Sequence, residues 1–237
     1  MTIEDIELMS GIHQKKENRM IVELCGVPGA GKSTLLNKLI SKNQSVKVYT
    51  REDVYDRRKI ERTIRYFIAK FIGVGPDIKL YKIIKTLSQQ YPSCTERYEK
   101  RLFGLIIVLK CSRDKLIILE EGLIQYVSSI AYEEELSINE AFNDMMSIIR
   151  TFEKYKIVFC DLDTEECIAR IKKRNKEGDR YNLEDYTRIT KLLELKKGNI
   201  KRVIESMHIS EACILEINTK ETLDENVKKL QQFVFSR

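Results

Sequence analysis

The sequence contains no tryptophan, three prolines and only two histidines in 237 residues. With so few histidines, and with six cysteines that show no paired short spacing, a structural zinc site is not expected. Three of the cysteines, Cys25, Cys160 and Cys213, lie in or beside strand-like apolar runs, where a small buried thiol is the simplest interpretation. Unpaired thiols are typical of the reducing cytosol, so we expect a cytoplasmic protein.

Long apolar segments are also missing. No run approaches the roughly 20 apolar residues that a membrane-spanning helix requires, so a membrane partner is not expected. The first 19 residues carry acidic side chains and lack the apolar stretch of a signal peptide. We interpret residues 1–17 as an N-terminal extension of unassigned role.

The chain has 42 basic and 36 acidic residues, for a net charge of +6. An excess of positive charge favours polyanionic partners, which include both nucleic acids and nucleotides. The basic residues are not interleaved with aromatic residues in the pattern that stacks bases. Nucleic acid is therefore not expected as a partner, whereas a nucleotide is.

Five short apolar runs have the character of strands, and segments with helical periodicity separate them. Because most of the runs are apolar on both faces, they predict a parallel sheet covered by helices. The predicted strands are 20–25, 46–49, 115–120, 156–162 and 213–217. The predicted helices include 32–41, 59–72, 95–109, 138–152, 164–176 and 223–235. Residues 54–112 hold no clear strand and are interpreted as a helical insert within a single α/β domain of residues 1–237.

Residues 26–34 read GVPGAGKST, directly after the strand-like run MIVELC. The spacing G-x-x-x-x-G-K-[ST] lets backbone N–H groups surround a phosphate, while the lysine reaches the β- and γ-phosphates and the serine hydroxyl binds Mg²⁺. The sequence therefore predicts ATP and Mg²⁺ as cofactors, with Lys32 as a catalytic side chain and Ser33 as a metal ligand. The predicted nucleotide-binding residues are Gly26, Gly29, Ala30, Gly31, Lys32, Ser33 and Thr34.

The third predicted strand ends in Glu120 and Glu121. Proteins with such a glycine loop hold Mg²⁺ with a carboxylate at the tip of a neighbouring strand, where aspartate is the usual residue. We assign Glu120 to the metal and Glu121 to the substrate, and the sequence leaves open whether these two roles are exchanged.

Charged residues also follow the second predicted strand, where Arg51, Glu52 and Asp53 are consecutive. Loops at the carboxyl ends of parallel strands line the ligand crevice of open α/β sheets. A carboxylate there can accept a proton from a substrate hydroxyl, and an arginine can hold an anionic group. We assign Glu52 and Asp53 to catalysis and Arg51 to substrate binding, without deciding which carboxylate serves the acceptor.

The fourth strand is followed by ARIKKRNKEGDR at residues 169–180. This basic segment predicts a lid, residues 170–182, that closes over the transferred phosphoryl group and excludes water. The positive charges of Arg174 and Arg180 would stabilise the phosphoryl oxygens, so both are assigned to catalysis.

Taken in chain order, GVPGAGKST, the TRE of residues 50–52, ARIKKRNKEGDRYNLEDY and ILEINTKETLDENVKKL resemble the thymidylate kinase and deoxynucleoside kinase branch of P-loop NTPases. The resemblance covers most of residues 20–235. It implies a three-layer P-loop NTPase fold, in which helices flank a five-stranded parallel sheet and add a helical insert and a basic lid.

The resemblance also implies a kinase that transfers the γ-phosphoryl of MgATP to a small-molecule acceptor such as a nucleoside, a nucleotide or a sugar. The family has Asp-Arg or Glu-Arg after its third strand, whereas this sequence has Glu120-Glu121-Gly122, so the acceptor is not identified. Members of this branch often form dimers through their helices, and a homodimer is left open.

A strand that ends in two acids also resembles the Walker B strand and catalytic glutamate of mechanical ATPases. The alternative is therefore a P-loop ATPase or GTPase switch or motor domain that acts on a macromolecular partner. The sequence contains no LSGGQ-like signature and no NKxD-like guanine motif, and its basic lid favours the kinase.

Overall fold

The computed structural model describes residues 20–42, 48–49, 59–72, 77–112, 114–152, 154–174 and 185–235. For 48–49, 59–62, 71–72 and 111 it describes the backbone alone. Three predicted features lie outside the described residues: the N-terminal extension, residues 51–53, and the part of the lid from 175 to 182.

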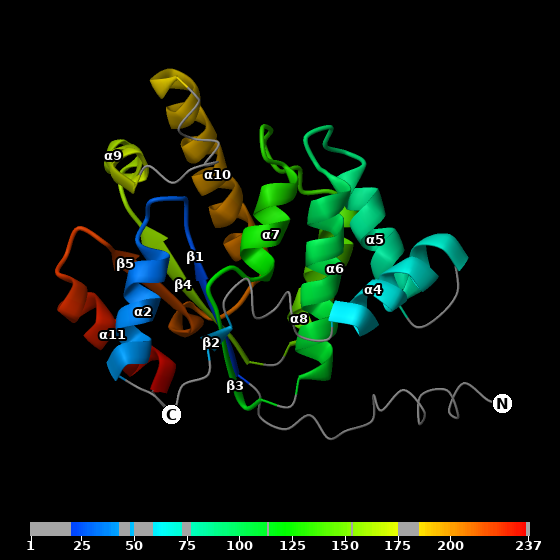
Figure 1. Ribbon diagram of the computed structural model, residues 1–237, viewed down its shortest axis with the longest axis horizontal. Helices are drawn as coiled ribbons and strands as arrows, with labels where there is room; N and C mark the ends of the chain where they lie inside the picture. The colour runs from blue at the N-terminus through cyan, green and yellow to red at the C-terminus, as the bar shows by residue number, and fades with distance from the viewer. Residues whose placement is uncertain are drawn as a thin grey trace.

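The described residues build a parallel sheet in the order β2-β3-β1-β4-β5 (Figure 1). The strands are β1 (Met20–Cys25), β2 (Val48–Tyr49), β3 (Leu116–Leu119), β4 (Lys154–Asp161) and β5 (Ile214–Asn218). Four of them are four to eight residues long, but β2 contributes only two residues beside β3. The predicted parallel sheet flanked by helices is confirmed, with four full strands rather than the five that the sequence predicts.

Helices connect the strands. They are α2 (Lys32–Lys42), α4 (Lys59–Phe67), α5 (Ile78–Ser88), α6 (Glu96–Cys111), α7 (Leu123–Ile130), α8 (Glu140–Arg150), α9 (Thr164–Arg174), α10 (Tyr186–Ser206) and α11 (Leu223–Phe235), with a π-helical turn η1 (Ile68–Ile72) and a 3-10 turn η3 (Glu211–Cys213). The helix predicted over 59–72 is thus α-helical only to Phe67 and continues as the π-helical turn. No described helix is both long enough and apolar enough to cross a membrane.

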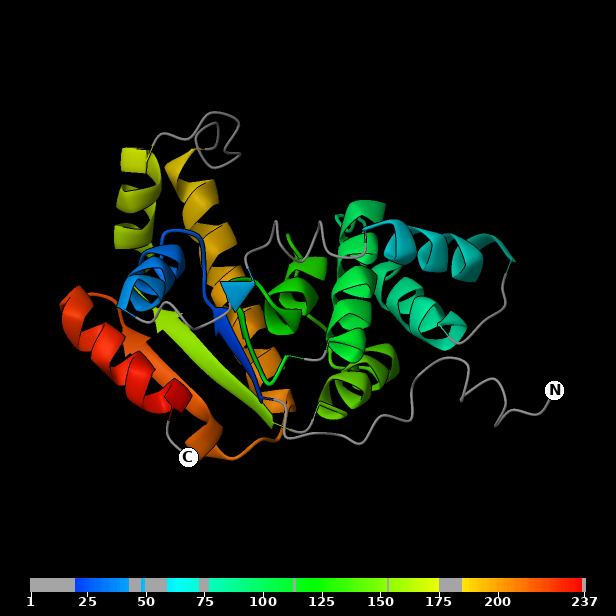
Figure 2. The ribbon, with the colours of Figure 1, turned by 60° about the horizontal axis from the view of Figure 1, so that its bottom comes forward.

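The sheet separates two hydrophobic cores, because alternate residues of a strand point to opposite faces. Ile21 and Cys25 of β1 belong to the core beneath α5, α6, α7 and α8. Val22 and Leu24 belong to the core beneath α2, α9 and α11. Figures 1 and 2 show α2 and α11 side by side on one face of the sheet and α6, α7 and α8 on the other, which gives three layers.

The described residues between β2 and β3 form the helices α4, α5 and α6, which stand apart from α2 in both ribbon views (Figures 1 and 2). Arg65 of α4 holds Asp77, the residue before α5, through two hydrogen bonds of 2.6 and 2.9 Å. Glu99 of α6 is buried and accepts hydrogen bonds from Ser88 at 2.6 Å and from Lys85 at 3.0 Å. These polar contacts fix the three helices to one another rather than to the sheet.

Candidate active site

The glycine loop between β1 and α2 has the backbone that its sequence predicts. Gly26, Gly29 and Gly31 have φ angles of +151°, +83° and +87°, a region that side-chain-bearing residues rarely adopt. A Cβ atom on Gly26 would lie 2.6 Å from the carbonyl oxygen of Cys160, and one on Gly29 would lie 2.5 Å from that of Cys167. Glycine is therefore required by both conformation and space.

Lys32 begins helix α2 and turns its side chain back over the loop. Its ammonium Nζ donates hydrogen bonds to the carbonyl oxygens of Gly26 at 2.7 Å and Val27 at 3.1 Å. The N-terminus of α2 points at the same loop and adds the positive end of the helix dipole. The positive charge of Lys32 and the N-terminus of α2 therefore converge at one end of the sheet, which is the environment that a phosphate chain requires.

The two predicted metal ligands meet below this loop. The Ser33 hydroxyl donates a hydrogen bond to the Oε1 atom of Glu120, the residue that follows β3. Register explains the meeting, because β3 pairs directly with β1 and sets Leu119 opposite Glu23. Glu121 follows as a half-buried residue.

Mg²⁺ is usually held in proteins by one or two side chains together with phosphate oxygens and water. A hydroxyl and a carboxylate in contact, beside a phosphate loop, fit that donor set. Among the described residues no group of three or more His, Cys, Asp or Glu side chains could form an all-protein metal site. Ser33 and Glu120 therefore have the donor chemistry of a site at which a metal ion is shared with a nucleotide.

Buried thiols surround the loop. Cys25, Cys160 and Cys167 are free and buried, as predicted for the first two, whereas Cys213 is only partly buried. Burial raises the pKa of Cys160 and of Cys167 to about 11 and moves that of Cys25 in the same direction. These thiols stay protonated near neutral pH and are unsuited to nucleophilic chemistry.

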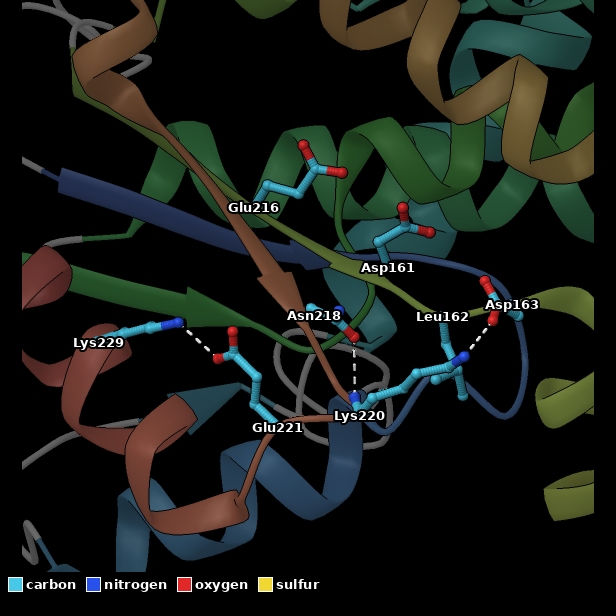
Figure 3. A pocket seen from close by; sticks show the side chains of 8 residues that line it. All are labelled: Asp161, Leu162, Asp163, Glu216, Asn218, Lys220, Glu221 and Lys229. Carbon is cyan, nitrogen blue, oxygen red and sulfur yellow. Dashed lines mark hydrogen bonds and ion pairs between the residues drawn. The ribbon is translucent and has the colours of Figure 1, made fainter.

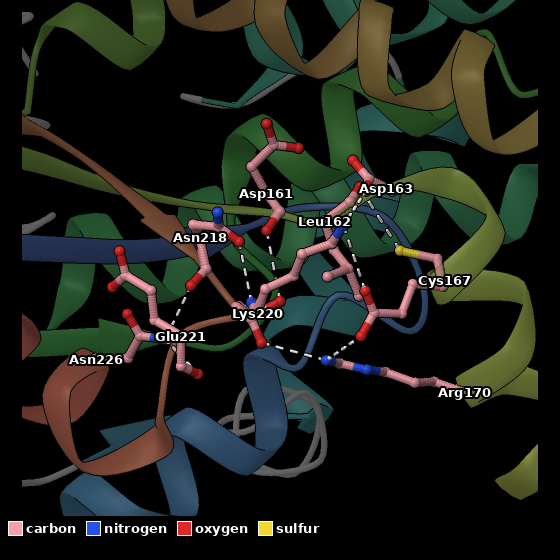
Figure 4. A network of polar contacts seen from close by, with 11 residues as sticks. Asp161, Leu162, Asp163, Cys167, Arg170, Asn218, Lys220, Glu221 and Asn226 are labelled. Atoms are coloured by element: carbon pink, nitrogen blue, oxygen red, sulfur yellow. Dashed lines mark hydrogen bonds and ion pairs between the residues drawn. The ribbon is translucent and has the colours of Figure 1, made fainter.

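Arg170 of α9 also reaches the loop. Its Nη2 atom donates to Glu166 at 3.1 Å and to the carbonyl oxygen of Thr219, after β5, at 3.2 Å. Figure 4 shows the Arg170 side chain directed toward the turn that carries Lys220. A Cβ atom on Gly31 would lie 3.5 Å from Nη1 of Arg170 and 3.7 Å from Thr219. Helix α9 and the turn after β5 therefore border the far end of the phosphate loop.

The sequence predicts phosphoryl contacts for Arg174 and Arg180, and not for Arg170. Arg174 is exposed at the last residue of α9, one helical turn beyond Arg170, while Arg180 lies outside the described residues. Arg170 and Arg174 are four residues apart in ARIKKR, so they lie on one face of the helix. This spacing is the sequence feature that could have identified Arg170 as a residue near the loop. Arg51, Glu52 and Asp53 lie outside the described residues too.

A pocket of about 300 Å³ opens at the carboxyl ends of β4 and β5, next to the turn that contains Thr219 (Figure 3). Its lining residues are Asp161, Leu162, Asp163, Glu216, Asn218, Lys220, Glu221 and Lys229. Lysines balance most of the carboxylates, since Lys220 pairs with Asp163, Lys229 with Glu221, and Lys197 of α10 with Asp161. The ion pair with Lys220 lowers the pKa of Asp163. The pocket is therefore a polar surface beside the turn that borders the phosphate loop.

A buried carboxyl group lies directly behind the loop. Glu23 of β1 has no exposed surface and accepts hydrogen bonds from the hydroxyl of Tyr155 and from backbone N–H groups at the start of α7. Burial raises its pKa to about 7, and the hydrogen bonds offset this only in part. Glu23 is not among the site residues predicted from the sequence, although an acidic residue inside the apolar run MIVELC is itself unusual.

The sequence matches the family model described as AAA domain over residues 21–194, a range that runs from β1 into α10. No curated protein matches the sequence significantly.

Two solved structures are similar to the chain as folds. Deoxyadenosine kinase from M. mycoides, with the products dCMP and a flexible dCDP bound, aligns with a TM-score of 0.52 at 16% identity, covering 90% of this chain and 97% of that chain. The YorR protein from Bacillus subtilis, in complex with phosphorylated GDP, aligns with a TM-score of 0.50 at 16% identity, covering 91% of this chain and 95% of that chain. At this identity the likeness shows a shared P-loop kinase-like fold, which agrees with the resemblance found in the sequence.

Proposed function

The chain belongs to the AAA domain family, and from that membership and the geometry of its loop we propose that it transfers the γ-phosphoryl of MgATP to a small-molecule acceptor. The observation that carries the proposal is the contact between Ser33 and Glu120 directly beside Lys32. A phosphate cradle, a cation and a hydroxyl–carboxylate pair at one sheet edge are the parts that phosphoryl transfer needs.

The donor phosphates would be held by the loop N–H groups and the N-terminus of α2. Lys32 would exchange its hydrogen bonds to Gly26 and Val27 for phosphate oxygens and stabilise the charge that spreads over them during transfer. Ser33 and Glu120 would hold Mg²⁺, which neutralises charge on the β- and γ-phosphate oxygens when bound. Arg170, beside Gly31, adds a second cation at the far end of the loop.

We assign acceptor binding to residues that were predicted from the sequence. Glu52 or Asp53 would position or deprotonate the acceptor, with Arg51 and Glu121 in contact with it. Arg174 and Arg180 of the lid would cover the transferred group and exclude water, which limits wasteful hydrolysis of ATP.

A nucleoside or nucleotide acceptor is favoured over a sugar. Of the two structures with a similar fold, one is a deoxyadenosine kinase with dCMP and dCDP bound, and the other is in complex with phosphorylated GDP. The missing arginine after Glu120 departs from the whole branch and does not choose between its acceptors. Because the first of these two structures is a deoxyadenosine kinase, a deoxynucleoside is the first acceptor class to test.

The test is an ATP hydrolysis assay without an acceptor and with single nucleosides, nucleotides and sugars. We expect slow basal turnover that rises with one acceptor, together with a phosphorylated product of that compound. Fast hydrolysis that no small molecule changes, and that DNA or a protein stimulates, would refute the kinase. Glu52→Gln and Asp53→Asn, assayed separately with the active acceptor, then decide which carboxylate serves it.

One observation favours a second candidate, an ATPase or GTPase switch or motor domain. The strand β3 is followed by two consecutive acids, Glu120 and Glu121, and the second would activate water in that case. Glu121→Gln would then abolish hydrolysis, whereas in the kinase it would weaken acceptor binding. The cytoplasmic location and the homodimer stay predictions.

A further inference from the structure

Glu23 is a buried ionisable residue that has no role in the phosphoryl transfer proposed above. It lies in the middle of β1, three residues before Gly26, and its side chain shares a strand face with Ile21 and Cys25. A carboxyl group without exposed surface lowers stability unless several hydrogen bonds compensate. The hydrogen bonds that hold this carboxyl group therefore bear on its role.

The carboxyl group of Glu23 caps helix α7 from outside that helix. Its Oε2 atom accepts a hydrogen bond from the N–H of Ile124 at 3.1 Å, and its Oε1 atom accepts one from the N–H of Gln125 at 2.9 Å. The residue at the N-cap position is Gly122, which has no side chain to do this. The hydroxyl of Tyr155 on β4 donates a further hydrogen bond to Oε2.

Gly122 leaves space for that carboxyl group. A Cβ atom on Gly122 would lie 2.4 Å from the Cδ and Oε2 atoms of Glu23. The φ angle of Gly122 is −113°, which any residue adopts, so the contact and not the backbone conformation requires glycine. The segment Glu120–Gly122 is therefore held at one end by the pairing of β3 with β1 and at the other by contact with Glu23.

The same helix turn leads back to the glycine loop. The side-chain Oε1 atom of Gln125 accepts a hydrogen bond from the N–H of Gly26 at 3.3 Å. Gln125 is buried and its own N–H is held by Glu23. Glu23 thus contacts, directly or through one residue, both the segment that carries Glu120 and the first residue of the loop.

We propose that Glu23 is a positioning residue that aligns Glu120 with Ser33 and sets the Gly26 end of the phosphate loop. This inference rests on the proposed function, because the aligned groups are those assigned to Mg²⁺ and the nucleotide. Glu23 would contact neither Mg²⁺ nor the nucleotide, and it acts through Gly122, Ile124 and Gln125. Loss of the carboxylate would let the Glu120 segment move and would weaken the binding of Mg²⁺ with the nucleotide.

The experiment measures binding of a fluorescent ATP analogue to the full chain, titrated with Mg²⁺ and, separately, in EDTA. We expect Glu23→Gln to raise the Mg²⁺ concentration for half-maximal binding about 10-fold or more, with a smaller change in EDTA. Tyr155→Phe keeps the carboxylate and removes one donor, so it should shift the same value in the same direction by less. This variant also tests the inference if Glu23→Gln does not fold.

Glu99→Gln is the matched control. Glu99 is a second buried carboxyl group, but its hydrogen-bond partners Ser88, Lys85 and Tyr66 all belong to helices between β2 and β3. It should lower thermal stability and leave the Mg²⁺ midpoint unchanged. Equal midpoints for the parent, Glu23→Gln and Tyr155→Phe would overturn the inference alone. A parent chain that binds no ATP analogue would overturn the proposed function and this inference with it.

Discussion

The hydroxyl of Ser33 donates a hydrogen bond to the carboxylate of Glu120, although the two residues are 87 positions apart in the sequence. One lies in the first turn of α2 and the other just after β3. They meet because β1, which leads into α2, pairs in parallel register with β3. The contact joins the nucleotide-binding motif to an acid that sequence alone places only at a strand end.

Glu120→Gln should therefore weaken the binding of Mg²⁺ that the reaction requires. A neutral amide binds a hard cation less well than a carboxylate, so the Mg²⁺ concentration for half-maximal turnover should rise about 10- to 100-fold. The measurement is a Mg²⁺ titration of turnover. Glu121→Gln is the control, and if it shifts the midpoint while Glu120→Gln does not, the metal role belongs to Glu121.

Lys32→Ala should reduce turnover by about 100-fold or more, because a cation that stabilises transition-state charge is lost. Its two hydrogen bonds are to loop carbonyls, so the helix and sheet should remain folded, as circular dichroism would show. Lys38→Ala is the control on the same helix, since Lys38 lies 3.9 Å from Asp224 at the surface and should leave turnover unchanged. Full activity of Lys32→Ala would refute the site.

Gly29→Ala should be destabilising and should weaken nucleotide binding. Positive φ costs an alanine about 1–2 kcal/mol, and its Cβ atom would also lie 2.5 Å from the carbonyl oxygen of Cys167. Gly198→Ala is the opposite control: Gly198 lies inside α10 with open space around its Cα atom, and alanine should stabilise by about 0.5–1 kcal/mol. Urea unfolding measures both, and equal effects would contradict the loop geometry.

The free energy of unfolding should depend on pH through Glu23. Its pKa is about 7 in the folded protein against 4.5 for the free side chain, so the folded state binds more protons than the unfolded state between these values. The contribution of this group to stability is then largest below pH 4.5 and falls by about 3 kcal/mol as pH rises through 7. The Glu23→Gln variant lacks this titrating group, so the stability of the variant should fall less than that of the parent over the same pH range.

Urea unfolding of the parent and of Glu23→Gln at pH 5, 6, 7 and 8 checks this difference. Comparison of the two proteins cancels the contributions of all other groups. Identical pH slopes would mean that Glu23 ionises at its ordinary pKa despite its burial.

The glycine loop and β1 were predictable because their signals are local. Glycines at fixed spacing, an apolar run before them and a helical pattern after them depend on no other part of the chain. The sequence also predicted α2 and α11 to within one residue at each end. The short β2 and the π-helical turn after Phe67 depend on pairing and packing that a single sequence does not reveal.

Helices α7 and α10 were not identified from the sequence, for different reasons. Every residue of α7 is buried, so it lacks the polar face that marks a surface helix. Helix α10 contributes Ile189 to one core and Ile200 to the other, so its apolar face changes along its length. Arg170, Gln125 and Glu23 make their contacts with residues that are distant in the sequence. Their position beside the loop is therefore evident only in the structure.

The central position of β1 has a consequence for amide exchange. This strand pairs on both sides, and Val22 and Leu24 on one face and Ile21 and Cys25 on the other have at most 3% exposure. Backbone amides with such protection exchange with deuterium only when the domain opens as a whole. The amides of β1 should therefore be among the slowest to exchange, so the phosphate loop begins at a strand that opens only with the whole domain.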